Sequence, residues 1–516
     1  MIVNTVLRLI GHRQIAGDHS SRSVRPDVGV SIVPSTVASP TSISSPRSNS
    51  WRENAPVNFR ERSLAVHLAG ALFAMLTITA MIPSIARCEE FAKVEHSRRY
   101  EPTWESLDRH PTPKWFMDAK IGLFVYPPHP TEEQFHRYLS DRGLPDRVFH
   151  MAGQSWDSIE WNADEVADLA QQAGARYVVF GVDPHSYFLA YPSKYADRGD
   201  SPFVSLRPDD TRKDYVHEIA DAARRRGLRF GIYRNYLHPG KNKYFLETTY
   251  ELIDRYRPET LWLDGDKLSY TADELRSREL AAYYYNNSSK PEEVAIEDAL
   301  GSYKRSTWGK SLDHGDWFRK ELSPRHEDIA DGYFVRYETV YRRRNNAPEL
   351  SRGLVNNLVE WLADATSKNG NLELAIHLGP ESLYQFEQRT LQQIGMWLKV
   401  NGEAIYDTQP WLDGKPGSMT ENGVGVRYTK RDDSLYAILF DWPHGQINLP
   451  YLRLEDNTRI QMLGLKSEFR WEQTENGVTV RMPHDSDFDR DEGFAAEIPC
   501  DHAFSLKITP KPTWMK

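Results

Sequence analysis

Cysteine is scarce in this sequence: the 516-residue chain contains only Cys88 and Cys500. Two cysteines so far apart exclude a disulfide framework, a CxxC redox centre and a thiolate zinc site, although one long-range bridge after export stays open. An HExxH motif is also absent. The sequence therefore predicts no metal site and no cofactor.

Basic residues are fewer than acidic ones, 64 against 73. The net charge is −9 and the pI is about 6.0, and no long basic stripe is present that could neutralise nucleic-acid phosphates. We therefore expect no nucleic-acid partner. Aromatic residues, in contrast, are numerous, with 14 tryptophans and 26 tyrosines. Such numbers suit either surfaces that stack on sugar rings or large aromatic cores.

The N-terminal part of the chain predicts a disordered lead followed by a signal-like segment. Residues 1–62 include the Ser-, Pro- and Thr-rich stretch 31–50, which offers little apolar surface to bury. Residues 63–86 form an apolar run behind two arginines and end in Ser-Ile-Ala, a small-x-small cleavage pattern. A secretory signal peptide has this design, but this one starts about 60 residues late, as an over-called start codon would explain. We therefore expect export to the periplasm or beyond, with no stable membrane partner; a membrane anchor is the alternative.

Residues 95–405 alternate between strand-like and helix-like patterns. Short apolar runs, which suit buried strands, alternate with segments whose apolar residues recur at steps of three and four, as in helices. Most of the helix-like segments end in glycine. About seven such units favour a (β/α)8-like (TIM) barrel, although a doubly wound sheet has the same rhythm. Strands are predicted at 121–126, 177–182, 229–234, 260–265, 294–298, 333–338 and 372–378, and helices at 164–175, 213–227, 357–370 and 385–402.

The helical pattern stops after Pro410. Short β-rich runs separated by turn residues follow, which is typical of a β-sandwich, here over residues 411–512. The predicted strands lie at 423–429, 434–441, 477–482 and 503–508.

Asp264 is the first candidate for chemistry. It follows a run of four residues that suit a strand buried on both faces, and Gly265 behind it begins a loop. In a barrel of parallel strands, that strand end lies at the catalytic rim. An aspartate after a strand can also be only a turn-former or a helix cap, so position alone leaves these roles open.

Seven segments form a pattern that goes beyond periodicity. They are PKWFMDAKIGLFVY (113–126), AGARYVVF with YPSKYADR (173–198), RRRGLRFGIY (224–233), YELIDRYRPETLWLDG (250–265), HGDWF with Glu321 (314–321), KNGNLEL (368–374) and IGMWLKVNGEAIYDTQPW (394–411). In this order they resemble the α-L-fucosidases of glycoside hydrolase family 29. The resemblance implies a catalytic barrel followed by a β-sandwich. It also implies a retaining exo-glycosidase that removes terminal fucose, or a related deoxy-sugar, from a fucosylated or related glycan.

The resemblance assigns two carboxylates. Asp264 matches the family's nucleophile, and Glu321 matches the glutamate that we take for the general acid/base, with Glu338 as the alternative. Such a pair fits a retaining glycosidase, in which one carboxylate attacks the anomeric carbon and one carboxyl protonates the leaving oxygen. The two carboxyl groups then lie about 5–5.5 Å apart, against about 6.5–9.5 Å in an inverting enzyme.

Several positions depart from the family's pattern. Tyr126 stands at a family histidine, Pro184 replaces another histidine beside the surviving His185, Ala299 replaces an arginine, and Arg234 stands at a tyrosine. A buried hydroxyl left unpaired costs about 1–3 kcal/mol, so four such losses need replacement groups. The alternative is therefore a catalytically inactive carbohydrate-binding relative that keeps the barrel.

The candidate sugar contacts follow from these comparisons. Arg234 is also a candidate for recognising an anionic substituent such as sulfate. The predicted substrate-binding residues are Tyr126, His129, His185, Tyr233, Arg234, Trp262 and Trp317, and further replacement groups are Asp183, His238 and Glu297.

Overall fold

The structure is a computed structural model of the chain. It describes residues 99–127, 132–141, 143, 161–183, 188–196, 201, 204–205, 214–235, 242–264, 271–298, 300, 314–320, 332–340, 352–378, 381–411, 420, 423–443, 445–482 and 499–515. The predicted lead (1–62) and signal-like segment (63–86) lie outside these residues. Within the described ranges, no helix has both the length and the apolar character needed to cross a membrane.

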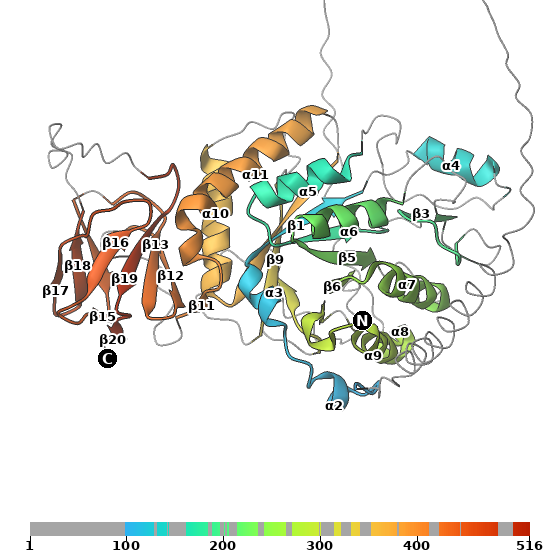
Figure 1. Cartoon of the computed structure of the whole chain (residues 1–516), viewed down its shortest axis with the longest axis horizontal. Coiled ribbons are helices and arrows are strands. Elements are labelled where there is room, and N and C mark those ends of the chain that lie inside the picture. The colour runs from blue at the N-terminus through green and yellow to red at the C-terminus, as the bar shows by residue number, and fades with distance from the viewer. Residues whose placement is uncertain are drawn as a thin grey trace, which may run out of the picture. The chain divides into compact units, whose positions relative to one another are not determined.

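Eight parallel strands follow one another in chain order around a barrel (Figure 1). Each pairs in parallel with the next, β10 pairs with β1, and a parallel bridge between Glu297 and Trp317 joins β7 to β8. This closure confirms the (β/α)8-like barrel and excludes the doubly wound sheet, whose edge strands stay unpaired. The strands are β1 (Ile121–Tyr126), β2 (Tyr177–Gly181), β5 (Arg229–Asn235), β6 (Thr260–Asp264), β7 (Ala295–Ile296), β8 (Phe318–Lys320), β9 (Phe334–Thr339) and β10 (Gly370–His377).

Helices cover the outside of the strands (Figure 1). Asn162 and Asp214 cap the first turns of two of them by accepting backbone N–H bonds. Four helices lie where the sequence predicts them: α5 (Ala163–Gln172), α6 (Tyr215–Arg225), α10 (Arg352–Ser367) and α11 (Glu381–Asn401). The others are α2 (Trp104–Leu107), α3 (Lys114–Ala119), α4 (Glu132–Asp141), α7 (Asn242–Tyr256), α8 (Ala272–Leu275) and α9 (Ser277–Asn287).

Aromatic side chains fill the barrel. Residues two apart on a strand point to the same face, so alternate residues of each strand meet inside. The ring centroids of Phe124 and Trp262 lie 5.2 Å apart, and those of Trp262 and Trp317 lie 5.8 Å apart. At Gly122, a Cβ would lie 2.3 Å from the Tyr177 ring, so the glycine makes room for the tyrosine. Because the interior is solid, chemistry is confined to the ends of the strands.

The C-terminal part forms the predicted β-sandwich. The larger sheet has the order β11 (Gln409–Pro410), β12 (Val426–Arg431), β13 (Ser434–Leu439), β19 (Phe504–Thr509), β16 (Arg459–Met462). The facing sheet has the order β14 (Gln446–Pro450), β18 (Gly477–Arg481), β17 (Trp471–Gln473), and a short third sheet pairs β15 (Leu452–Arg453) with β20 (Thr513–Trp514). Buried residues of both sheets share one core, for example Leu439 of β13 and Val480 of β18. Several contacts tie the sandwich to barrel helices. Arg427 donates to Asp364 of α10 at 2.7 Å, for example, and the Trp397 indole of α11 donates to the Ala503 carbonyl at 2.6 Å.

Glu373 is an acidic residue inside the barrel. It lies on β10 opposite Gly122 of β1 and Tyr337 of β9, and its side chain is buried. Burial raises the pKa of Glu373 to about 8, and the neighbouring Tyr177 hydroxyl offsets only part of this rise. The folded chain therefore holds a proton that the unfolded chain releases near the ordinary pKa of 4.5.

This buried carboxyl predicts a pH-dependent stability. Because the folded state binds the extra proton, stability should fall as the pH rises from about 4.5 to about 8. Glu373→Gln removes the ionisable group, so its thermal unfolding midpoint should change less than that of the wild type between pH 5 and pH 8.5. Identical pH dependence in the two proteins would show that Glu373 is not the proton-binding group.

Candidate active site

Asp264 ends β6 at the rim of the barrel. The three residues before it, Leu261, Trp262 and Leu263, are almost completely buried. The Asp264 side chain, in contrast, is 17% exposed. Its Oδ2 accepts a 2.7 Å hydrogen bond from the Tyr233 hydroxyl, and its Oδ1 lies 3.3 Å from Nη2 of Arg319. The next described helix, α8, is capped by Thr271. Asp264 is therefore a rim carboxylate and not the cap of that helix.

Tyr233 reaches Asp264 from the neighbouring strand. In the β5–β6 register, Tyr233 lies opposite Trp262 and Asn235 lies opposite Asp264. The Asn235 side-chain amide donates to the Tyr233 oxygen at 3.4 Å. Burial is the larger cause and the charge of Asp264 the second, and together they raise the pKa of Tyr233 well above its usual value. The hydroxyl therefore stays protonated and remains a donor to the carboxylate.

Arg319 is the second described residue that contacts Asp264, and it was not among the residues predicted from the sequence. It lies on β8, two residues after Trp317, so both side chains point into the barrel. Its guanidinium is 9% exposed, and its Cζ lies 5.5 Å from the ring centroid of Trp262. The available signal was the inward alternation of Trp317 and Arg319, which the surrounding run of charged residues hides.

Asp316 holds the start of β8 in place. Its carboxylate is buried and lies 2.6 Å from Nδ1 of His110, and it accepts from the Tyr285 hydroxyl at 3.0 Å and the Ile296 N–H at 2.8 Å. Burial raises the pKa of Asp316, although His110 and these donors oppose the rise. The cluster links β8 to β7 and to α9, which fixes the strand that carries Arg319.

An aromatic group lies at the same end of the barrel. The Tyr126 hydroxyl is 2.7 Å from the Tyr337 hydroxyl, and the Tyr126 ring stacks on His377 with centroids 4.3 Å apart. Tyr126 and His377 are only partly buried. The predicted sugar contacts Trp262 and Trp317 are each 1% exposed, so in this structure they form the floor beneath Asp264.

Arg234 lies near the same end of the barrel as Asp264, but its side chain points to the outer face, so the structure does not support the prediction that it binds substrate. Its side chain and that of Asp183 are fully buried and form an ion pair, with Nε and Nη2 of Arg234 at 3.0 and 2.9 Å from Oδ2. The guanidinium also donates to the hydroxyls of Thr248 and Thr249 and lies over the Phe245 ring, all on α7. Arg234 thus joins β5 to α7.

Glu338 also points away from Asp264. On β9, Val335 and Tyr337 face the barrel interior, so Glu338 belongs to the opposite face. Its carboxylate is buried and binds Nη2 of Arg336 at 3.0 Å, and Arg336 in turn lies over Trp361 of α10. We therefore do not retain Glu338 as the alternative acid/base.

Other predicted residues fall outside the described part of the chain. These are Glu321, His129, His185 and His238, and their roles stay predictions. Asp183 and Glu297 are fully buried. In the described ranges, no group of three or more histidine, cysteine or acidic side chains is arranged to hold a metal ion.

The buried Asp183–Arg234 pair predicts a large loss of stability when only one charge is removed. Arg234→Met should lower the free energy of unfolding by about 3–5 kcal/mol, because the Asp183 charge would stay buried without its partner. The double variant Asp183→Asn with Arg234→Met should recover part of the loss, measured as thermal unfolding midpoints. An unchanged midpoint, together with selective loss of binding to a sulfated fucoside, would instead restore Arg234 as a ligand contact.

Comparisons with known proteins agree on one family. A family model described as Alpha-L-fucosidase matches residues 88–403, and one described as Alpha-L-fucosidase C-terminal domain matches residues 420–509. The chain is 30% identical to an alpha-L-fucosidase of Branchiostoma floridae over 453 residues, which cover 80% of this chain and 96% of that protein. It is 26% identical to the tissue alpha-L-fucosidase of Homo sapiens over 464 residues, 82% and 95% of the two chains.

A solved structure shares the fold. Thermotoga maritima alpha-fucosidase in complex with a mechanism based inhibitor superposes with a TM-score of 0.59 at 24% identity, covering 80% of this chain and 100% of that one. The family models match the parts of the chain that form the barrel and the sandwich. The chain is therefore a glycoside hydrolase that belongs to the α-L-fucosidase family, glycoside hydrolase family 29.

Proposed function

We propose that the chain hydrolyses terminal fucose, or a related deoxy-sugar, by a retaining mechanism with two carboxylates. The observation that carries the proposal is the setting of Asp264, a partly exposed carboxylate at a strand end, oriented by Tyr233 and Arg319. A carboxylate in such a fixed orientation can attack an anomeric carbon without reorganising first.

The two oxygens of Asp264 differ in their contacts. Among the described residues, Oδ2 accepts the short bond from Tyr233, at 2.7 Å, whereas the contact of Oδ1 is the longer one to Arg319, at 3.3 Å. Hydrogen bonds weaken with distance, so the lone pairs of Oδ1 are the less engaged ones. We assign Oδ1 as the attacking oxygen and Oδ2 as the oxygen that positions the group.

Glu321 is the proposed acid/base because of its match to the family's segment, two residues after Arg319 in the sequence. In the first step, Asp264 forms a bond to the anomeric carbon while the bond to the leaving oxygen breaks, and that oxygen takes the proton of Glu321. In the second step, the Glu321 carboxylate takes a proton from water, whose oxygen displaces Asp264. Two inversions retain the configuration of the sugar.

Removing the nucleophile tests this proposal. The wild type should hydrolyse 4-nitrophenyl α-L-fucoside, and Asp264→Ala should lower kcat at least about 10³-fold with an unchanged thermal midpoint. Added azide should restore part of the turnover and give a fucosyl azide of inverted configuration, because azide then occupies the place of the carboxylate. The control is Asp456→Ala, an exposed aspartate of the sandwich, which should keep full activity.

A second candidate function is carbohydrate binding without turnover. It is favoured by the contacts to both oxygens of Asp264, since a nucleophile held by two donors is a weaker nucleophile. Under this alternative, the wild type would bind fucose but release nothing from a panel of aryl glycosides, and no mechanism-based fluoro-sugar would label Asp264. That result would replace the hydrolytic proposal.

We also propose that the protein is exported. The proposal depends on the apolar segment 63–86 with its small-x-small ending. Expression of the full sequence in a bacterial host should give a product in the periplasm or medium whose N-terminus, read by Edman degradation, lies just after residue 86. A product that keeps residues 63–86 and sediments with membranes would favour the anchor.

A further inference from the structure

A pocket of about 410 Å³ lies at the end of the barrel opposite Asp264. Its lining comes from the end of α6, the start of β5, the junction between α7 and β6, and the segment that follows α9. Glu259 in its wall directly precedes β6, and Asp264 ends that strand. A strand rises about 3.3 Å per residue, so more than about 13 Å separates the two places. The pocket is therefore not part of the candidate active site.

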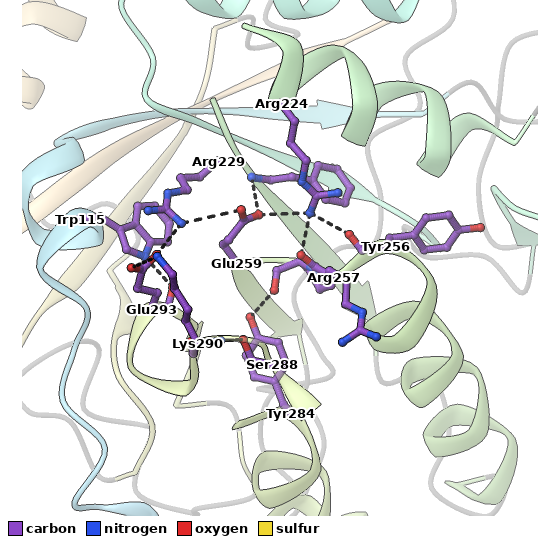
Figure 2. Close-up of polar contacts among 12 residues, drawn as sticks. Trp115, Arg224, Arg229, Tyr256, Arg257, Glu259, Tyr284, Ser288, Lys290 and Glu293 are labelled. Carbon is purple, nitrogen blue, oxygen red and sulfur yellow. Dashed lines mark hydrogen bonds and ion pairs between the residues drawn. The ribbon is translucent and has the colours of Figure 1, made fainter. Parts of the chain in front are cut away.

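The pocket carries a positive charge. Arg224 and Arg229 meet at Glu259, and Lys290 lies beside Glu293 (Figure 2). The protein as a whole has a net charge of −9, whereas four cations and two carboxylates in this wall give 4 − 2 = +2. The cations are Arg224, Arg229, Arg257 and Lys290, and the carboxylates are Glu259 and Glu293.

Each of the three guanidinium groups uses only one of its nitrogens in contacts to described residues. For Arg224 it is Nη2, which donates to the carbonyls of Tyr256 and Arg257 and to Glu259. For Arg229 it is Nη1, 3.0 Å from Glu293 and 3.9 Å from Glu259. For Arg257 it is Nη1, which donates to the Asn287 carbonyl at 2.9 Å. A guanidinium has five N–H donors, so Nε and the second Nη of each remain for another acceptor.

These contacts also hold the donors in place. Arg224 and Arg229 are 35% and 36% exposed, and their Cζ atoms lie over the rings of Phe230 and Trp115 at 5.6 and 5.2 Å. Contact through the flat face of a guanidinium leaves its N–H edge open. An anion that bound here would therefore meet oriented donors and would cost little side-chain entropy.

A purely structural role explains part of this arrangement. Arg224 donates to carbonyls at the end of α7, and Arg257 donates to the carbonyl that ends α9. Basic residues stabilise such helix ends. Capping needs one nitrogen of each arginine, however, and does not explain a hollow with two positive charges in excess. Helix capping therefore leaves several N–H donors and the excess positive charge of the pocket without an explanation.

We propose that this pocket binds a tetrahedral oxyanion, sulfate or phosphate, either free or carried on a sugar. A guanidinium fork suits such a group, and Arg224, Arg229 and Arg257 all line the pocket together with Lys290, which adds a point charge. The site does not depend on the proposed hydrolysis of fucosides.

Titration calorimetry on the full-length protein tests this site. The probes are inorganic sulfate, glucose 6-phosphate and neutral glucose, each at constant ionic strength maintained with sodium chloride. We expect saturable binding of at least one of the two anions at one site per chain and no heat from glucose. Tighter binding of glucose 6-phosphate would identify a sugar-borne anion as the ligand, and tighter binding of sulfate a free ion.

Charge-matched variants separate the site from general electrostatics. Arg257→Gln with Lys290→Gln removes both excess charges and should raise Kd at least about tenfold, since charge-assisted hydrogen bonds are the strong ones. Lys290→Gln alone, at a side chain that is 63% exposed and so harmless to folding, should raise Kd about threefold. The control, Arg453→Gln with Lys466→Gln, removes two exposed charges from the sandwich and should change Kd less than twofold.

Two outcomes would overturn the proposal. One is the absence of saturable heat from either anion in the wild type. The other is equal affinity in the wild type, the pocket variant and the sandwich control, which would mean that the ions only screen charge. Turnover of an aryl fucoside is measured separately on the same proteins and should stay unchanged in every variant, so failure here is distinct from failure of the hydrolytic proposal.

Discussion

The seam between β7 and β8 is the constraint on which the rim of the barrel depends. The two strands are short and meet through a single bridge, between Glu297 and Trp317, so few backbone bonds hold the barrel closed there. The buried carboxylate of Asp316 reinforces this seam by binding a neighbouring histidine, a tyrosine and a backbone N–H at once. Because β8 is held in this way, Arg319 can reach across to Asp264.

The sequence was informative where apolar periodicity and strand ends carry the signal. The barrel, the sandwich and the rim position of Asp264 follow from patterns of burial, and Tyr233 follows from the family resemblance. Arg319 does not, because its strand spans only three residues and owes its place to the buried anchor at Asp316. Helix α9 was missed for a related reason: its buried tyrosines carry hydroxyls, which blur the apolar pattern.

Two departures from the family's pattern, Asp183 and Arg234, belong to a single ion pair. Asp183 begins the segment that departs from a family motif, and Arg234 stands at a family tyrosine. From the sequence alone they are separate candidates for the sugar pocket, but the fold joins them in a buried ion pair between β5 and the residues that follow β2. Burying either charge without the other would be strongly destabilising, so we expect the two residues to be substituted together in relatives of this chain. Residues that diverge from a family near its active site can thus belong to the scaffold.

The bond from the Trp397 indole to the Ala503 carbonyl links the last barrel helix to a residue more than a hundred positions later in the chain. During synthesis, α11 leaves the ribosome long before that carbonyl exists. The indole N–H therefore has no partner carbonyl until the segment that leads into β19 has been synthesised. Docking of α11 is in this sense a late event, and a nascent chain that stops short of β19 would carry a barrel with an unfinished surface.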